Sequence, residues 1–381
     1  MKVTQIHELL NTVTSEVLGT ENIVKEDLTN LVDIGTEIID ADKVDNFVNK
    51  LVHHIGKVQF NNETYAGKAK NVLMDSWEFG AILQKIDAEL PEAYENDSWK
   101  LVNGDSYDPN IFYQPKVSSQ FFDSKVTFEI PISFAEKQVK GSFSNAEQMN
   151  GFLSMLINRV DTSFTIKLDE LIMRTINNYI GAVVNAKDTN NSVNLLALYN
   201  TQRGKTLTVD KCLSDADFLR FANFTINTYI GRINRISSLF NIGKRERFTN
   251  VEDTNIILLD DFVNSSDVYL QADVRHNEFT GLKEVDTVPY WQGSGKSYAF
   301  SDISKIDVKI NNGLAKGADV SQSGILGVLF DKKALGVTNL DKRVTTNFNP
   351  KAEFYTNFYK ADSGYFNDFN QNFIVFYVSE T

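Results

Sequence analysis

The stretch SFSNAEQMNGFLSMLINRV, residues 142–160, predicts the beginning of an unusually long helix. Ser144 and Glu147 form a capping box, in which each side chain satisfies a backbone N–H of the first turn. One stripe of mostly apolar residues then recurs at spacings of three and four: Met149, Leu153, Leu156, Val160, Phe164, Leu168, Leu171, Thr175 and Tyr179. The stripe ends before Gly181, the expected C-cap. Because such a helix extends for about 50 Å, a large part of the protein must lie along it.

Two segments before this helix predict half-buried strands, because apolar and polar residues alternate in them. In residues 82–90 the apolar face carries Ile82, Ile86, Ala88 and Leu90, and the charged face carries Lys85, Asp87 and Glu89. Residues 126–134 alternate just as strictly, and the stretch between the two strands, YENDSWKLVNGDSYDPNIFYQP, is rich in turn residues. We therefore expect one long hairpin. Pro131 cannot donate to a strand ladder and belongs on an edge, so the hairpin should reach away from the core.

The rest of the chain predicts a mixed helix and strand region. A second long helix is expected from about Ser214 to Phe240, followed by strands at NIILLDDF, VYLQADV and KIDVKI. SGILGVLFDKKALGV predicts a strand, a turn and a short helix. The aromatic C-terminal stretch, residues 353–378, predicts a hairpin that turns at Asp362-Ser-Gly. We expect its buried face to pack on the long helix, with Phe164 against Phe373 and Phe376.

The composition excludes several classes of function. Lys and Arg number 38 against 50 Asp and Glu, and the net charge of −12 is opposite in sign to that of a nucleic-acid binder. The single cysteine, Cys212, excludes an internal disulfide framework and a multi-cysteine metal site. The sequence has no signal peptide and no apolar run of about 18 residues, which predicts a soluble cytoplasmic product without a membrane segment.

The motifs that suggest catalysis are incomplete. GSGKS, residues 293–297, copies the end of a phosphate-binding loop, but Tyr290 stands where that motif needs its first glycine. Asp260 and Asp261, which end the apolar run IILL, resemble the end of a second nucleotide-binding motif. The four histidines are His7 and His276, which are isolated, and His53 and His54, which are adjacent and diverge on a helix. We predict no catalytic, cofactor-binding or metal-binding residues and no enzymatic activity.

The order of these parts resembles the major capsid proteins of tailed bacteriophages, with the Hong Kong 97-type α+β fold. The resemblance covers essentially the whole chain and is closest to the subunits of small short-tailed phages of Gram-positive hosts. Four stretches carry it: FVNKLVHHIGKVQF, residues 128–160, TNIILLDDFVNSSDVYL, and residues 324–378.

The resemblance implies a division of the chain and a role for each part. The parts are an N-terminal arm (1–57), an extended loop formed by a β-hairpin (58–142), a peripheral domain with the long spine helix (143–199), an axial domain (200–340), and a C-terminal return to the peripheral domain (341–381). It also implies self-assembly into hexamers and pentamers of an icosahedral head that encloses double-stranded DNA without sequence-specific binding. Scaffolding and portal proteins are the implied partners, the virion the location, and the host bacterial cytoplasm the place of synthesis.

Two alternatives stay open at this point. An encapsulin has the same fold but encloses cargo protein, and the contents of purified particles distinguish it from a phage head. A nucleotide hydrolase built on residues 293–297 is the unrelated alternative, which ATP binding would support. Some members of the capsid family cross-link a lysine of the extended loop to a neighbouring subunit. Lys85, Lys100 and Lys116 lie in that region, but no motif singles one out.

Overall fold

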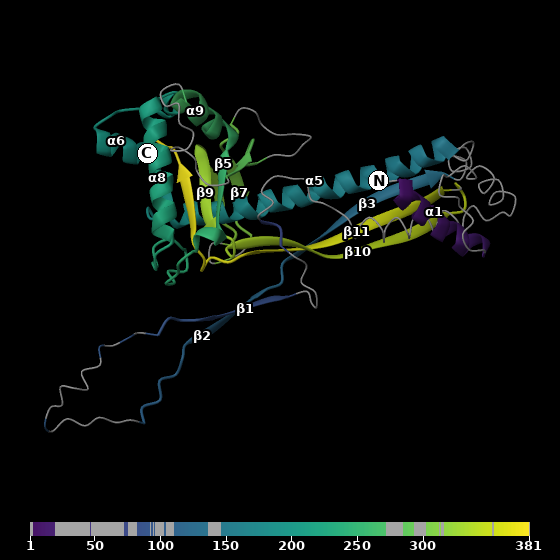
Figure 1. Cartoon of the computed structure of the whole chain (residues 1–381), viewed down its shortest axis with the longest axis horizontal. Helices are drawn as coiled ribbons and strands as arrows, with labels where there is room; N and C mark the ends of the chain where they lie inside the picture. Colours follow the sequence, from purple (N-terminus) through teal and green to yellow (C-terminus); the bar gives the residue numbers. More distant parts are fainter. Residues whose placement is uncertain are drawn as a thin grey trace.

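The computed structural model describes residues 3–19, 46, 72–74, 82–91, 93, 95, 103, 110–135, 146–271, 285–292, 302–311, 313, 316–352 and 354–380. The molecule is elongated (Figure 1). A long helix, α5 (Ala146–Ala186), runs beside a long sheet and ends in a body of strands and helices. The first helix, α1 (Val3–Leu18), lies at the far end from this body, and a hairpin projects to one side.

The helix α5 (Ala146–Ala186) connects the two halves of the molecule. It has 41 residues and therefore extends for about 60 Å. Every member of the predicted stripe whose side chain is described is buried: Val160, Phe164, Leu168, Leu171, Thr175 and Tyr179. Near its C-terminal end α5 is buried on almost all sides, because it enters the body there. The prediction of a long helix with one buried stripe is confirmed over these residues.

The long sheet has three antiparallel strands in the order β10–β11–β3. Their bounds are β3 (Lys125–Ala135), β10 (Leu335–Asn349) and β11 (Phe354–Asn367). All three strands contact α5, and β3 lies at an edge, as Pro131 predicts. The sheet covers the apolar stripe in the first half of the helix.

The body is built on a five-stranded mixed sheet in the order β4–β12–β9–β5–β6. Its strands are β4 (Ser192–Asn194), β5 (Thr254–Leu259), β6 (Asp286–Val288), β9 (Ile325–Asp331) and β12 (Phe373–Tyr377). The central strand β9 is buried at every position, which is typical of a strand covered on both faces. A two-stranded ribbon of β7 (Ile306–Lys309) and β8 (Asp319–Gln322) packs on α5. The helices are α6 (Leu195–Arg203), α7 (Val209–Cys212), α8 (Ala216–Ile233), α9 (Asp260–Gln271) and the short 3-10 helix η2 (Val251–Asp253).

The predicted pairing of residues 82–90 with 126–134 is wrong. The strand β1 (Leu83–Ala88) pairs instead with β2 (Val117–Phe122), and β3 pairs with β11. Alternation identifies the two faces of a strand, but it does not identify the partner strand. A hairpin is therefore present, but its second strand is β2, which is closer in sequence than the predicted one. Only two residues separate β2 from β3 of the long sheet.

Four predictions for the C-terminal half are also wrong. No turn occurs at Asp362-Ser-Gly, because β11 continues through it; the turn lies at residues 367–372, and β12 then joins the body. The segment after β9 begins β10 and is not a helix. The beginning of VYLQADV is the end of α9, and the helix expected to reach Phe240 ends at Ile233. A short apolar run is compatible with a helix or a strand, and its contacts in the folded chain decide which of the two forms.

Gly181 does not end the long helix. A Cβ atom at this position would lie 2.7 Å from Val308 Cγ2, so the glycine allows the ribbon of β7 and β8 to approach α5. The helix ends five residues later, where Lys187 adopts a left-handed conformation with a φ of 52°. Ser144, the predicted N-cap, lies outside the described residues.

Phe164 is buried as predicted, but its neighbours are different. It lies beside Leu73, Phe128 and Ala361, under the long sheet. Phe373 stacks instead on Tyr179, four turns further along the helix, with 4.0 Å between ring centroids. The body strand β12, not a C-terminal hairpin, therefore provides the aromatic contact.

We predict that Phe164→Ala lowers the free energy of unfolding of the unassembled subunit by about 3–5 kcal/mol, because it leaves a cavity in a buried site. Chemical denaturation measures the loss. The matched control is Ile166→Ala on the same helix, where the side chain is 47% exposed and the expected change is within about 0.5 kcal/mol. Equal small losses for both variants would contradict the packing of α5 on the long sheet.

Candidate interaction surface

The hairpin of β1 and β2 exposes its apolar face. Cross-strand pairing places Ile86 opposite Ser119 and Gln84 opposite Phe121 on this face. The large apolar side chains here and at the strand ends are between 52% and 69% exposed: Ile82, Ile86, Leu90, Val117 and Phe121. Phe112 and Tyr113, just before β2, are more exposed still. An apolar strip of this size on one hairpin marks an interaction surface.

The charged face of the hairpin points toward the body, the reverse of the arrangement in an ordinary surface strand. Lys85 Nζ lies 3.2 Å from Asp368 Oδ2 and donates to the carbonyl oxygen of Lys333 at 2.6 Å. Asp87 forms an ion pair with Arg247. Glu89 Oε1 accepts from Arg245 Nη1 at 3.1 Å. We call these three contacts, Lys85–Asp368, Asp87–Arg247 and Glu89–Arg245, the root ion pairs.

Lys85 occupies the most enclosed position of the three. Its ammonium group lies 4.2 Å from the ring centroid of Phe366 and 5.4 Å from that of Phe122, which is a cation–π arrangement. Burial lowers the pKa of Lys85, and the Asp368 carboxylate opposes part of that effect. The Asp368 side chain is only 2% exposed. Removing one partner of such a pair leaves the other charge poorly solvated.

The turn at residues 367–372, which joins β11 to β12, is held by α5. The hydroxyl of Tyr179 donates to the carbonyl oxygens of Asp368 and Gln371, at 2.9 and 3.1 Å. Asn178 Nδ2 donates to Asn367 Oδ1, and Asn367 Nδ2 donates to the carbonyl oxygen of Thr175, both at 2.9 Å. Burial raises the pKa of Tyr179 well above its usual value, which keeps the hydroxyl protonated as a donor. The anchor for Lys85 is therefore fixed to the long helix.

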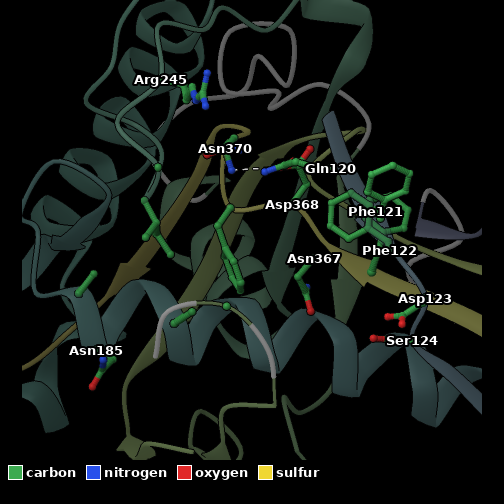
Figure 2. Close-up of a pocket in the computed structure, with 17 residues that line it drawn as sticks. Gln120, Phe121, Phe122, Asp123, Ser124, Asn185, Arg245, Asn367, Asp368 and Asn370 are labelled. Atoms are coloured by element: carbon green, nitrogen blue, oxygen red, sulfur yellow. Dashed lines mark hydrogen bonds between the residues drawn. The ribbon is translucent and has the colours of Figure 1, made fainter. Parts of the chain in front are cut away.

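Two hollows flank the base of the hairpin. One has a volume of about 930 Å³ and lies between the end of β2, the C-terminal part of α5 and the turn at 367–372. Figure 2 shows Phe122, the last residue of β2, and the following Asp123 on one side of it, with Asn185 of α5 and Arg245 on the other. The second, of about 450 Å³, is lined by residues of the root ion pairs and by Phe248. The hairpin thus meets the body through polar contacts rather than a packed apolar core.

The structure describes only some of the residues that the sequence suggested for chemistry. Cys212 is buried, and burial raises its pKa to about 11, so it is a poor nucleophile. Asp260 and Asp261 begin α9, directly after β5, whereas residues 293–297 lie outside the described residues, as do His53, His54 and His276. No group of three or more metal-ligating side chains occurs among the residues that the structure describes.

The lysines suggested for a cross-link differ in their surroundings. Lys85 is occupied within its own chain by Asp368. Lys116 is 82% exposed and lies 3.8 Å from Glu89 of the same hairpin. Lys100 lies outside the described residues. The sequence did not predict Asp368, Arg245 and Arg247 as ion-pair partners of the hairpin. The charged face of residues 82–90 indicated that countercharges were needed, but not which residues supply them.

Comparisons with solved structures find capsids of several phages. A capsid of Staphylococcus phage Andhra has a similar fold, at 11% identity over 84% of this chain and 86% of that chain, with a TM-score of 0.50. Capsids of cyanophage P-SCSP1u and bacteriophage PhiM1 match over 84% of this chain and 94% and 89% of theirs, at 11% and 6% identity with TM-scores of 0.47 and 0.44. No curated protein sequence matches the chain.

The class of the chain is identified by a family profile. This class comprises the structural proteins that form phage capsids. Residues 10–377 match the profile of the Phi29-like phage major capsid protein, and the chain belongs to this family. It is therefore a capsid component of the virion that assembles with itself into a shell. The family is structural and not enzymatic, and the nucleotide hydrolase is not favoured. None of the described helices is both long and apolar enough to cross a membrane.

We predict that Cys212 resists alkylation in the folded subunit, because the thiol is buried and its pKa is raised to about 11. At pH 8 the thiolate fraction is small and access is blocked, so iodoacetamide should modify the folded protein much more slowly than the denatured protein. Mass spectrometry of the timed reaction measures both rates. Equal rates would show that Cys212 is accessible in the folded subunit.

Proposed function

We propose that this capsid protein has the Hong Kong 97-type architecture and forms the hexamers and pentamers of an icosahedral head that encloses double-stranded DNA. The observation that carries the proposal is the hairpin with its apolar face directed away from the body. A second copy of the chain is the partner that every subunit of a shell has available. The sequence resemblance supports a relationship to small short-tailed phages of Gram-positive hosts.

The proposed division of the chain follows the same architecture. The hairpin belongs to the extended loop (58–142), and α5 is the spine of the peripheral domain (143–199). The C-terminal return (341–381) starts in the long sheet and ends with β12 in the body sheet. Most of the body, from α7 to β9, falls in the axial domain (200–340). An exposed apolar group on α8 and α9 supports contacts between copies around a symmetry axis: Phe224, Val268 and Tyr269. The Asn223 side-chain amide donates to Ser266 Oγ at 3.2 Å and joins these two helices.

The charge of the chain supports enclosure of DNA rather than tight binding to it. A net charge of −12 repels phosphate on average, so we expect DNA to be retained by the closed wall. Scaffolding and portal proteins are proposed as partners, and the host bacterial cytoplasm as the place of synthesis. The N-terminal arm (1–57) is proposed as a separate segment, of which α1 is the described part.

Purified particles test this function. Expression of the chain with its neighbouring head genes should give closed shells of uniform size by electron microscopy, and particles from infected cells should contain nuclease-protected double-stranded DNA. Cargo protein in place of DNA would contradict the proposal and favour an encapsulin. Failure of the chain to form any closed particle would contradict the shell itself.

We predict that the double variant Ile86→Ala, Phe121→Ala weakens assembly without unfolding the subunit. Both side chains are exposed in the single subunit, so their loss removes only intersubunit contacts. Full burial of such a side chain contributes about 1.5–3 kcal/mol, which corresponds to at least about a tenfold rise in the critical concentration of assembly. Light scattering across a concentration series measures this threshold.

The matched control is Gln84→Ala, Ser119→Ala, which shortens the two polar side chains that hydrogen-bond each other on the same face. This variant should assemble close to the wild-type threshold. Circular dichroism establishes that both double variants are folded. Assembly of Ile86→Ala, Phe121→Ala at the wild-type concentration would remove the hairpin from the proposed contact.

A further inference from the structure

The base of the hairpin has a charge pattern that matches the body residue by residue. Along the inward face of β1 and just beyond it, the charges are positive at Lys85 and negative at Asp87 and Glu89. The body presents the opposite order: Asp368 opposite Lys85, then Arg247 and Arg245. Because alternate residues of a strand share a face, all three contacts can form together in only one register.

The root ion pairs are supported by few apolar contacts. The hollows of about 930 and 450 Å³ lie on either side of them, so a packed interface does not hold the hairpin against the body. The aromatic contact at the base is that of Phe122 with Phe366, whose ring centroids are 5.1 Å apart. Beyond it, the direction of the hairpin depends on charge contacts. Two strands alone do not form a stable independent sheet, which makes this attachment more important.

We propose that the root ion pairs position the hairpin: they set its direction relative to the body, and their loss lets it swing about the Phe122–Phe366 contact while the body stays folded. Lys85, Asp87 and Glu89 are thus positioning residues for the apolar face. The role of this arrangement in assembly rests on the proposed function, because a shell contact forms only if the apolar face meets the neighbouring subunit at a fixed angle. The positional claim itself concerns the single subunit.

The three contacts differ in how much they restrain the hairpin. Lys85–Asp368 is the most enclosed, with side chains 22% and 2% exposed, and bulk salt screens it least. Glu89–Arg245 is largely exposed, and pairs of this kind contribute little. The other charged groups near Lys85 are Asp331 and Lys333, which have opposite signs. Lys85 and Asp87 are therefore the residues whose loss should matter most.

Removal of the Lys85 charge leaves Asp368 with fewer partners, but the body should stay folded. The Asp368 carboxylate also accepts from the backbone N–H of Asn370 at 3.1 Å, and the Gln371 side-chain amide lies 3.4 Å from it. The turn keeps its hydrogen bonds to Tyr179 as well. Lys85→Met preserves most of the length of the side chain and its contact with the two aromatic rings. The change therefore removes the ammonium group, with its ion pair to Asp368 and its hydrogen bond to the Lys333 carbonyl, and keeps most of the bulk of the side chain.

A distance between spin labels on the hairpin and the body tests the proposal. Ala88→Cys on the hairpin and Thr201→Cys on α6 are exposed attachment sites, while the native Cys212 is buried. Double electron–electron resonance on the unassembled subunit should give one narrow distance distribution for the otherwise unchanged protein. Lys85→Met and Asp87→Asn should each broaden the distribution and shift its mean. Circular dichroism checks that each variant is folded.

Lys116→Met is the matched control, because Lys116 lies on the same hairpin and, among the described residues, pairs with Glu89 of the hairpin itself. Its distribution should remain narrow. An unchanged distribution in both Lys85→Met and Asp87→Asn, or equal broadening in Lys116→Met, would overturn the proposal. Because the subunit is unassembled, these outcomes do not bear on whether it forms shells. A failure of shell formation likewise leaves the distances in the single subunit unaffected.

Discussion

The hydrogen bonds between Tyr179 and the turn at residues 367–372 are the constraint on which the rest of the structure depends. The turn joins the long sheet to the body sheet, and Phe373, the first residue after it, stacks on the same tyrosine. Two sheets are therefore fixed to one helix at one position. Asp368, within the turn, also receives Lys85 from the hairpin. The long sheet, the body and the hairpin thus take their relative positions from a single buried site on α5.

The sequence predicted the elements of the fold better than their partners. The stripe on α5 was recognisable because it repeats over many turns, and each of its described members is buried. The strands at 82–90 and 126–134 were recognisable by alternation, but not their pairing, because a pattern of period two fits any partner. The turn predicted at Asp362 failed for a similar reason. Ser363 and Gly364 are common in turns, yet β10 and β3 pair with β11 on both sides through this region.

The sequence indicated part of the interaction surface. The sequence showed one apolar and one charged face on β1, and a folded monomer would normally bury the apolar one. The structure has the opposite arrangement, which supports the proposed contact of the apolar face with a neighbouring subunit. The countercharges could not be predicted, since Lys85 and Asp368 are 283 residues apart and nothing in the local pattern connects them. The proposed function of such a protein depends on the orientation of an interaction surface and not on a catalytic group.

The most direct test of this account is an electron cryomicroscopy map of the assembled shell at side-chain resolution. The account predicts that Ile86 and Phe121 of each hairpin lie within about 4.5 Å of apolar side chains of a neighbouring subunit. It also predicts that Lys85 still contacts Asp368 of its own chain. A map in which the apolar face of the hairpin points into solvent, or folds back on its own body, would contradict the central claim.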